Sequence, residues 1–513
     1  MNKNKKIILL ILALSALTRF AFFGHPNQTV FDEVHFGKFI SGYFTGQYFF
    51  DIHPPLGKLL ISGMGYLTGF QPGFSFANIG ETFPDRHYLW LRFLPTLAGA
   101  LLPLVIFLLA QTLGFSRKAS LLAGLLTVFE NALLVQSRFI LLDSFLLLFG
   151  FSALLFYFKY RPPEVQPREL CLTKVKPWSD KGLTLGLKWL ILSGLTAGLA
   201  ASVKWTGLSF LGIILILELA SKIKTIIQRR SGDTFSSAVE KKYVHRSLSK
   251  SLWQSVFGLI LIPLAIYTSI FALHFYLLPK SGPGDAFMSA EFQKTLAGNV
   301  HHQNSQASTL SFVGKFTELN KQMYSSNQRI TATHPYGSKW HSWPFLSRSV
   351  FFWQDTTHPR EEKIYLLGNP LIWWAGSIAM ILLIVKSIKK VILRKATWRR
   401  GTLFASTVET KSSSPEPWDS SNFTENFLLL GFFINLLPFI GIGRVMFLYH
   451  YFPSLIFTIL TLAYLANKAN KKSLFAFLTV ISVAGFLYFS PLTYGLPLSP
   501  QIQNYLFWFA NWR

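Results

Sequence analysis

Two adjacent carboxylates, Asp32 and Glu33, stand in the densest group of ionisable and aromatic residues in the sequence, over residues 30–60. Neighbouring carboxylates raise each other's pKa, and so does a surrounding of low dielectric constant. A carboxylate shifted in this way accepts a proton from a hydroxyl group near neutral pH. The other interpretation is a solvated acidic pair. Both stay open here, although aromatic neighbours and a total of only 23 acidic residues favour a functional role.

The run DIHPPLGK follows at residues 51–58. Its two prolines fix the backbone and exclude a helix there, so His53 and Lys58 are expected on a stiff turn. In one interpretation the prolines merely end a loop, and Lys58 extends its charge to water from an interfacial helix. In the other, His53 and Lys58 face a lipid phosphate.

A basic residue, Arg92, lies inside the apolar run YLWLRFLPTL. A cation in hydrocarbon is costly, so Arg92 should face the protein interior or pair with an anion. The candidate partners are Asp32, Glu33 and a phosphate group.

Further basic residues mark other membrane ends. Arg138 and Asp143 are five residues apart, which fits an ion pair between helices as well as it fits a site. Lys204 and Arg444 occupy similar positions elsewhere in the chain. Together these cations suggest a basic ring around one cavity, suited to an anionic lipid head group.

Metal, nucleotide and hydrolase chemistry have little support. The histidines at 301, 302, 334 and 341 show no HExxH spacing, and there is one cysteine. Nucleophile-elbow and phosphate-binding glycine motifs are missing from the sequence. We therefore expect no required cofactor and no metal site, and leave assistance by a divalent cation open.

The elements that must hold these residues are membrane spans. Half of the 513 residues are hydrophobic and 14% are charged, against roughly 25% charged in soluble domains. Apolar runs near the 20 residues that cross a bilayer predict eleven spans, with a shorter interfacial segment at 56–70. The spans are expected at 7–23, 87–110, 119–136, 138–158, 186–203, 207–222, 253–278, 367–386, 424–443, 446–468 and 473–490. Arg19 and the lack of a cleavage pattern favour an uncleaved first span.

Basic residues set the expected orientation. Alternate loops hold 31 of the 49 Lys and Arg residues, including the basic loops at 159–188, 221–252 and 386–423. Because basic loops stay cytoplasmic, the N-terminus is predicted inside and the C-terminus outside. The two long loops, 24–86 and 279–366, are then external. The net charge of +26 is mainly this topology signal, so nucleic acid is not an expected partner.

With these residues in view, the sequence resembles the protein O-mannosyltransferases, membrane glycosyltransferases of the GT-C class. The resemblance covers nearly all of the membrane region. It is carried by FDEVHFG and FFDIHPPLGK within 31–58, LRFLP at 91–95, RFILLDS at 138–144, SVKWTGL at 202–208, YLLGNPLIWW at 365–374 and FLYHYFPSLIF at 447–457. It implies an all-α polytopic membrane protein, with residues 1–513 forming a single GT-C membrane domain.

The resemblance also implies a reaction. Mannose would pass from a polyprenyl-phosphate mannose to Ser or Thr hydroxyls of secreted or membrane proteins, with inversion at the anomeric carbon. The family's acidic residue of the first external loop falls on Asp32, with Glu33 beside it. Such a transfer has an oxocarbenium-like transition state, and positive groups stabilise the departing phosphate.

Individual roles follow from that reaction. Arg92 aligns with a basic residue that the family uses and is the first candidate for the donor phosphate, followed by Arg138, Lys58, His53 and Arg444. Four residues of the long external loop are expected to cover the sugar or the acceptor: Tyr336, Trp340, His341 and Trp343.

One departure from the family concerns size. Eukaryotic members insert a β-trefoil domain into the long external loop, and the 88 residues of 279–366 cannot hold it. The chain is therefore expected to be a prokaryotic-type member, acting at the outer face of a plasma membrane. Membrane lipid is an expected partner, and association with a translocon or a second copy is left open.

Two alternatives remain. One is another lipid-linked GT-C transferase, with a different sugar or with a lipid or glycan acceptor. The other is a lipid head-group transporter, which would carry polar residues at mid-span and internal symmetry. The sequence instead gathers its polar clusters at one face.

Overall fold

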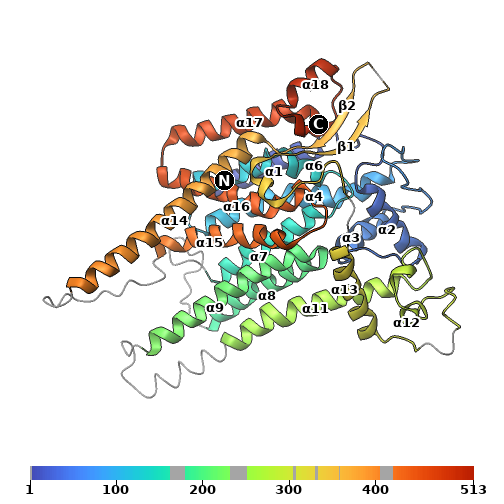
Figure 1. Cartoon of the computed structure of the whole chain (residues 1–513), viewed down its shortest axis with the longest axis horizontal. Helices are drawn as coiled ribbons and strands as arrows, with labels where there is room; N and C mark the ends of the chain where they lie inside the picture. The colour runs from blue at the N-terminus through green and yellow to red at the C-terminus, as the bar shows by residue number, and fades with distance from the viewer. Residues whose placement is uncertain are drawn as a thin grey trace.

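The computed structural model describes residues 3–161, 180–230, 251–303, 308–329, 333–357, 359–404 and 420–513. The basic loops expected at 159–188, 221–252 and 386–423 lie partly outside these ranges. Helices dominate the described part of the chain (Figure 1).

Nine helical segments in the described ranges are long and apolar enough to cross a membrane. They contain α4 (His87–Thr112), α7 (Asp143–Tyr160), α8 (Asp180–Val203), α9 (Leu208–Arg230), α11 (Ile262–Leu277, after the π-helical turn Phe257–Leu261), α14 (Pro370–Phe404), α15 (Ser420–Leu436), α16 (Phe452–Ala469) and α17 (Lys472–Tyr494). The prediction of a polytopic helical membrane protein is confirmed.

Two of the eleven predicted spans differ from these nine. The helix α1 (Lys3–Phe20) covers the first, but its 18 residues include four basic ones. The second, expected as one span at 119–136, is a pair of shorter helices, α5 (Arg117–Val128) and α6 (Asn131–Ser137), which meet at an angle of 57°. The prediction of a continuous span there was wrong.

Charged side chains explain the break between α5 and α6. Arg19 of α1 donates to the backbone oxygens of Thr127 and Val128 at 2.8 and 2.6 Å, which occupies carbonyls at the end of α5. Glu130 accepts from the amides of Leu133 and Asn369, at 2.7 and 2.8 Å, and so caps the start of α6. Cation and anion thus satisfy the backbone on the two sides of the break.

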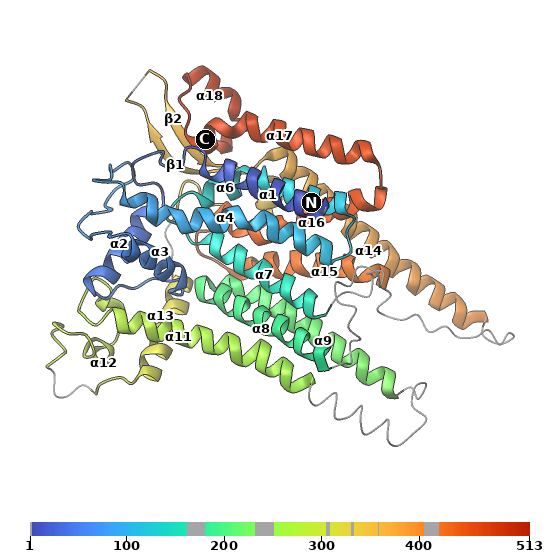
Figure 2. The ribbon, with the colours of Figure 1, turned by 180° about the vertical axis from the view of Figure 1, so that it is seen from behind.

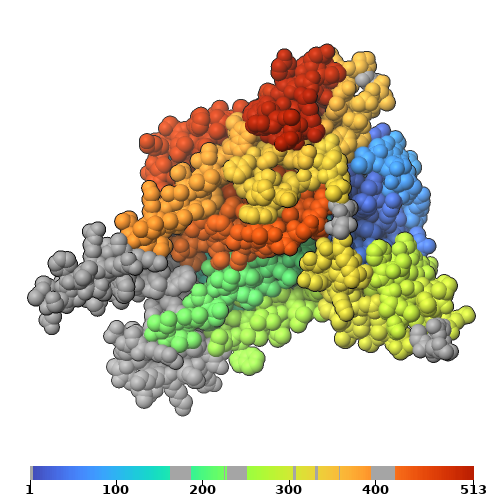
Figure 3. Space-filling view, viewed as in Figure 1, coloured from blue at the N-terminus to red at the C-terminus, as the bar shows by residue number. Residues whose placement is uncertain are grey.

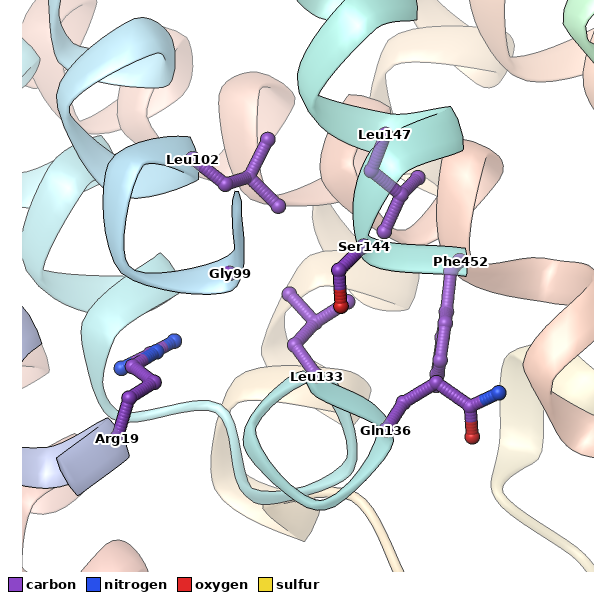
Figure 4. A pocket seen from close by; sticks show the side chains of 8 residues that line it. All are labelled: Arg19, Gly99, Leu102, Leu133, Gln136, Ser144, Leu147 and Phe452. Atoms are coloured by element: carbon purple, nitrogen blue, oxygen red, sulfur yellow. The ribbon is translucent and has the colours of Figure 1, made fainter. Parts of the chain in front are cut away.

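A small pocket lies beside this break (Figure 4). Arg19 and Gly99 stand on one side of it, and Ser144, Leu147 and Phe452 on the other. The helices α1, α4, α7 and α16 therefore meet around α6, which fixes the short helix in the middle of the bundle.

Both long loops gather at one end of the bundle, which we call the site end (Figures 1 and 2). Their short elements are α2 (Glu33–Thr45), α3 (Leu56–Leu67), η4 (Asp285–Phe287), α12 (Ala290–Gln293), α13 (Phe312–Arg329), η5 (Trp340–Phe345), β1 (Val350–Asp355) and β2 (Glu362–Leu366). The 12-residue α3 is the apolar segment that the sequence placed at the interface. The expected co-location of loops 24–86 and 279–366 is therefore observed.

A two-stranded sheet interrupts the helical architecture. The strands β1 and β2 are antiparallel, with Val350 opposite Leu366 and a bulge between Phe351 and Trp353. The chain end packs beside the hairpin, as Figure 3 shows, and Glu361 and Leu498 exchange two backbone hydrogen bonds. The turns between the spans and the chain end include η2 (Trp205–Gly207), η6 (Leu437–Gly441), η7 (Leu448–Tyr451), α18 (Pro500–Leu506) and η8 (Ala510–Trp512).

Candidate functional site

Asp32 is the residue immediately before α2, and the β hairpin fixes the backbone that presents it. Phe31 adopts a positive φ of 39°, which is unfavourable for a residue with a large side chain. Its amide donates to the backbone oxygen of Phe352 at 3.0 Å, and the two rings stack at 4.6 Å. These contacts hold the unusual conformation, as expected at a position where the direction of the next side chain matters.

The carboxylate of Asp32 is half-buried and has no hydrogen bond to any residue that the structure describes. Burial raises its pKa to about 7, an increase to which the charges of Asp143 and Asp51 add, while Lys204 opposes it. The sequence predicts a pKa raised by Glu33 and by a surrounding of low dielectric constant, and burial is the main cause in the structure. The direction agrees, but the neighbouring charges that matter come from elsewhere.

Glu33 has a different environment although it is the next residue. It is fully buried and accepts four hydrogen bonds, at 2.7 to 2.9 Å. Two come from Arg92, and two come from the backbone amides of Val30 and Ile140. All its strong acceptor positions are therefore occupied by protein, so Glu33 joins α2, α4 and the end of α6 rather than facing a ligand.

Arg92 is likewise enclosed. Its remaining contacts are the backbone oxygens of Pro26 and Gln28 at 2.7 and 2.8 Å, and the rings of Phe83, Tyr88 and Phe139. The expectation that Arg92 pairs with an anion is met by Glu33. The geometry does not favour its expected contact with a donor phosphate, because no part of the side chain is exposed.

Arg138 is also a buried structural cation. It donates to the backbone oxygens of Phe22 and Thr493, at 2.5 and 3.1 Å, and lies over the ring of Tyr494. An ion pair between Arg138 and Asp143, one of the two interpretations of their spacing, is not formed. Asp143 instead binds Lys204 at 2.8 Å and the amide of Gln136 at 2.7 Å.

Lys204 and Asp143 therefore form an ion pair, and their two charges are the ones that act most strongly on the pKa of Asp32. Both are at least nine-tenths buried, and the ammonium group lies 5.3 Å from the centre of the Tyr449 ring. The sequence places Lys204 in the expected basic ring but gives it no individual role and no pairing with Asp143. Lys204 and Asp143 are 61 positions apart in the sequence, so spacing alone does not reveal the pair.

The DIHPPLGK turn lies in the same region, but its lysine is paired within the turn. Lys58 is buried and paired with Asp51, and it also donates to the backbone oxygen of His53 at 2.9 Å. Burial and four nearby basic groups, among them Lys204 and Arg444, hold the pKa of His53 well below its usual value. His53 is therefore a neutral imidazole near pH 7, and its expected contact with a lipid phosphate stays a prediction.

Arg444 differs from the other basic residues of this region. Its guanidinium is half-buried, and no carboxylate among the described residues lies within ion-pair distance. Burial lowers its pKa, and the nearby Tyr449 opposes this shift only in part. Lys204 is already paired, so Arg444 supplies the uncompensated positive charge close to His53.

Four residues of the long loop were expected to cover a ligand, and they divide into two kinds. Tyr336 stacks on Phe351, and Trp340 meets His341 edge to face, with His341 exposed. Trp343 is fully buried and stacks on His450 at 5.9 Å, so it supports the site end from within. The amide of Ser338 donates to the backbone oxygen of Met446, which ties this loop to the Arg444 segment.

Comparison with known proteins supports these observations. The family model described as dolichyl-phosphate-mannose-protein mannosyltransferase matches residues 9–279. The model for the C-terminal four-span region of protein O-mannosyltransferases matches residues 312–512. A solved structure of the Saccharomyces cerevisiae protein O-mannosyltransferase Pmt1-Pmt2 complex, bound to the sugar donor, overlaps this chain with a TM-score of 0.82. It covers 100% of this chain and 93% of the other at 22% identity, so it shows the shared fold.

The protein thus has the fold of the polytopic GT-C membrane proteins, as the sequence predicted. The chain belongs to the protein O-mannosyltransferase family. It is 35% identical over 338 residues to protein O-mannosyl-transferase 2 of Danio rerio, covering 66% of this chain. It is 36% identical over 289 residues to dolichyl-phosphate-mannose–protein mannosyltransferase 4 of Candida albicans, covering 56% of this chain. The matched regions span 40% and 35% of those relatives.

Proposed function

We propose that this protein transfers mannose from a polyprenyl-phosphate mannose to Ser or Thr hydroxyls of proteins, with inversion at the anomeric carbon. Family membership supports the reaction class, and relatives are named as dolichyl-phosphate-mannose–protein mannosyltransferases. The observation that carries the assignment to this chain is the carboxylate of Asp32. It has no hydrogen-bonding partner in the described structure, and its pKa is raised to about 7.

Asp32 is proposed as the general base. Its carboxylate would take the proton of the acceptor hydroxyl as the hydroxyl oxygen attacks the anomeric carbon of mannose. The bond from that carbon to the phosphate oxygen breaks, and the lipid phosphate leaves as an anion. A base with a pKa near the working pH combines a useful fraction of carboxylate with adequate basicity.

Arg444 and Lys204 are proposed to stabilise the departing phosphate. Arg444 lacks a carboxylate partner in the described part of the chain, and Lys204 is near enough to shift the pKa of both Asp32 and His53. Positive groups placed where negative charge develops lower the barrier. We assign Glu33, Arg92 and Arg138 to positioning, and we place Tyr336, Trp340 and His341 near the sugar or acceptor.

The proposed setting is the outer face of a prokaryotic plasma membrane. Both long loops lie at the site end, and the distribution of Lys and Arg in the sequence supports an external position for them. Membrane lipid surrounds the spans in this proposal. Association with a second copy is proposed by analogy with the paired chains named in the Pmt1-Pmt2 complex.

The decisive experiment is Asp32→Asn in the purified full-length protein, supplied with polyprenyl-phosphate mannose and a Thr-rich peptide. We expect transfer to fall by about 10²–10⁴-fold, the usual contribution of a general base, with donor binding retained. Asp85→Asn is the matched control, because Asp85 is an exposed carboxylate in the same loop. Turnover of Asp32→Asn at the wild-type rate would exclude Asp32 as the base. Transfer to a glycolipid in place of the peptide would favour the other lipid-linked transferase.

A further inference from the structure

The long loop builds a second hydrophobic core at the site end, separate from the main core of the bundle. It joins the end of α11 to α13 and to the segment after α2. Its buried members are Tyr43, Tyr48, Phe49, Leu59, Phe271, Phe275, Leu278, Met288, Phe292, Leu296, Leu319 and Met323. None of the residues assigned above to the phosphate or the sugar belongs to this second core.

A cavity of about 500 Å³ lies in the second core. It is lined by Tyr48, Phe275, Tyr276, Leu278, Pro279, Phe292, Thr295, Leu296 and Lys315. This volume falls in the range of sites that hold small molecules. The lining is mainly aromatic and aliphatic, with the ammonium group of Lys315 and the hydroxyl of Tyr48 as its distinctive polar groups.

Neither of these two polar groups is satisfied by the described protein. The Tyr48 hydroxyl is buried and has no hydrogen-bonding partner, although an unpaired buried hydroxyl is costly. Burial raises the pKa of Tyr48 well above its ordinary value, so the hydroxyl keeps its proton and remains a donor. Lys315 has no carboxylate within ion-pair distance in the described ranges, and it lies 5.0 Å from the ring of Phe275.

The nearby carboxylates do not neutralise Lys315. Glu318 accepts from the amide and hydroxyl of Ser289, at 2.6 and 2.8 Å. Asp285 accepts from Ser281 and Asn299, at 2.5 and 2.7 Å. Both carboxylates stay charged and act on Tyr48, but their hydrogen bonds go to local donors and neither forms an ion pair with Lys315. The cavity therefore keeps one unpaired cation and one free donor.

The cavity lies at a membrane boundary. Only 22% of the most apolar stretch of the span ending at Leu277 is buried in the protein, against 78% for the span that contains α16. Most of the α11 surface is therefore open to lipid. Figures 1 and 2 show α11 at the edge of the bundle, with α13 crossing its end. Exposed apolar side chains occur there: Tyr276 is 78% exposed and Val313 is 67% exposed. Such residues anchor proteins at the membrane surface.

We propose that this cavity binds an anionic phospholipid of the surrounding membrane. Its phosphate would lie between the Lys315 ammonium and the Tyr48 hydroxyl, and its glycerol and upper acyl chain would pack on Phe275, Phe292 and Leu296. A free donor and a cation fit a phosphate, and the apolar lining favours a lipid over a soluble phosphate. This lipid would be a structural ligand and not the sugar donor, since it binds outside the Asp32 region.

The test uses the purified, delipidated full-length protein and native mass spectrometry. Phosphatidylglycerol, phosphatidylcholine and soluble glycerol 3-phosphate are offered separately at equal concentration. We expect retention of phosphatidylglycerol only, with about fivefold weaker binding in Lys315→Ala, the loss typical of one basic residue at a lipid phosphate. Lys315→Arg should keep binding. Lys321→Ala is the control, because Lys321 is exposed on the same helix.

Tyr48→Phe should weaken binding while preserving the aromatic packing, and thermal unfolding of each variant checks that it is folded. Equal retention of both lipids, or equal losses in Lys315→Ala and Lys321→Ala, would overturn the proposal. Retention of glycerol 3-phosphate at the level of the lipid would show a phosphate site instead. Displacement of the lipid by a Thr-rich peptide would show that the cavity is an acceptor site.

Discussion

The buried pair between Glu33 and Arg92 offers a sharp test of how the site end is held together. Glu33→Gln preserves the size of the side chain but removes its charge. Each carboxylate oxygen of Glu33 accepts one hydrogen bond from Arg92 and one from a backbone amide. The NH₂ group of glutamine must therefore face two donors, whichever way the amide is turned.

The expected cost follows from that geometry. The substitution breaks two hydrogen bonds and leaves the Arg92 guanidinium as an uncompensated buried cation, which typically destabilises a protein by about 3–5 kcal/mol. With an unfolding entropy near 2 cal/mol/K per residue, a chain of this length has about 1 kcal/mol/K in total. The expected fall in Tm is therefore about 3–5 °C.

Thermal unfolding in detergent measures this fall for Glu33→Gln, Arg92→Met and the double variant. Because each single variant strands one charge, the double variant should lose less than the sum of both, with a coupling of up to about 3 kcal/mol. Transfer kinetics provide a second readout. A positioning role predicts that Arg92→Met lowers kcat while the KM for the lipid donor stays near the wild-type value.

Two results would refute this reasoning. An unchanged Tm in Glu33→Gln would mean that the pair contributes little to the folded state. A large increase in donor KM for Arg92→Met, with kcat unchanged, would restore the role that the sequence suggested, in which Arg92 binds the phosphate.

Three further predictions concern the proposed site. Burial raises the pKa of Asp32 to about 7, and the carboxylate is the active form of the proposed base. The value of kcat/KM should therefore rise about tenfold per pH unit below pH 7 and level off above it. A profile that is flat from pH 5 to 8 would contradict this. The same raised pKa destabilises the folded state as pH increases through 7, so Asp32→Asn should raise Tm relative to wild type at pH 8 but not at pH 4. Arg444→Met should raise the donor KM about fivefold, whereas Arg86→Met, at an exposed position of the first long loop, should not; equal effects in both would point to general surface charge.

The membrane spans could be predicted because their signal is local. The apolar runs predict eleven spans, and in the described structure ten of these positions hold either an apolar helical span or the bent pair α5–α6. The bend itself was not visible in the sequence. Glu130 is a single charge in a long apolar run, and its partner Asn369 is 239 residues away.

The site could be predicted only in part, for a similar reason. The aromatic surroundings of Asp32 and the isolation of Arg92 in an apolar run both indicated special environments. Which acid pairs with which base depends on contacts between distant helices. Asp143 is near Arg138 in the chain, yet its ion-pair partner in the fold is Lys204. Adjacent residues can also have different environments. Glu33 accepts four hydrogen bonds, while the carboxylate of Asp32 accepts none from the described residues.

The break between α5 and α6 has a consequence for the order in which the protein is assembled. The chain is made from its N-terminus, so Glu130 enters the membrane long before Asn369 exists. Asn131 next to it donates to Thr493 and to the backbone oxygen of Phe486, near the other end of the chain. The capped break can therefore be completed only after the last spans are inserted. The regions matched by the two family models, 9–279 and 312–512, are thus joined at the α5–α6 break by polar contacts that require both regions.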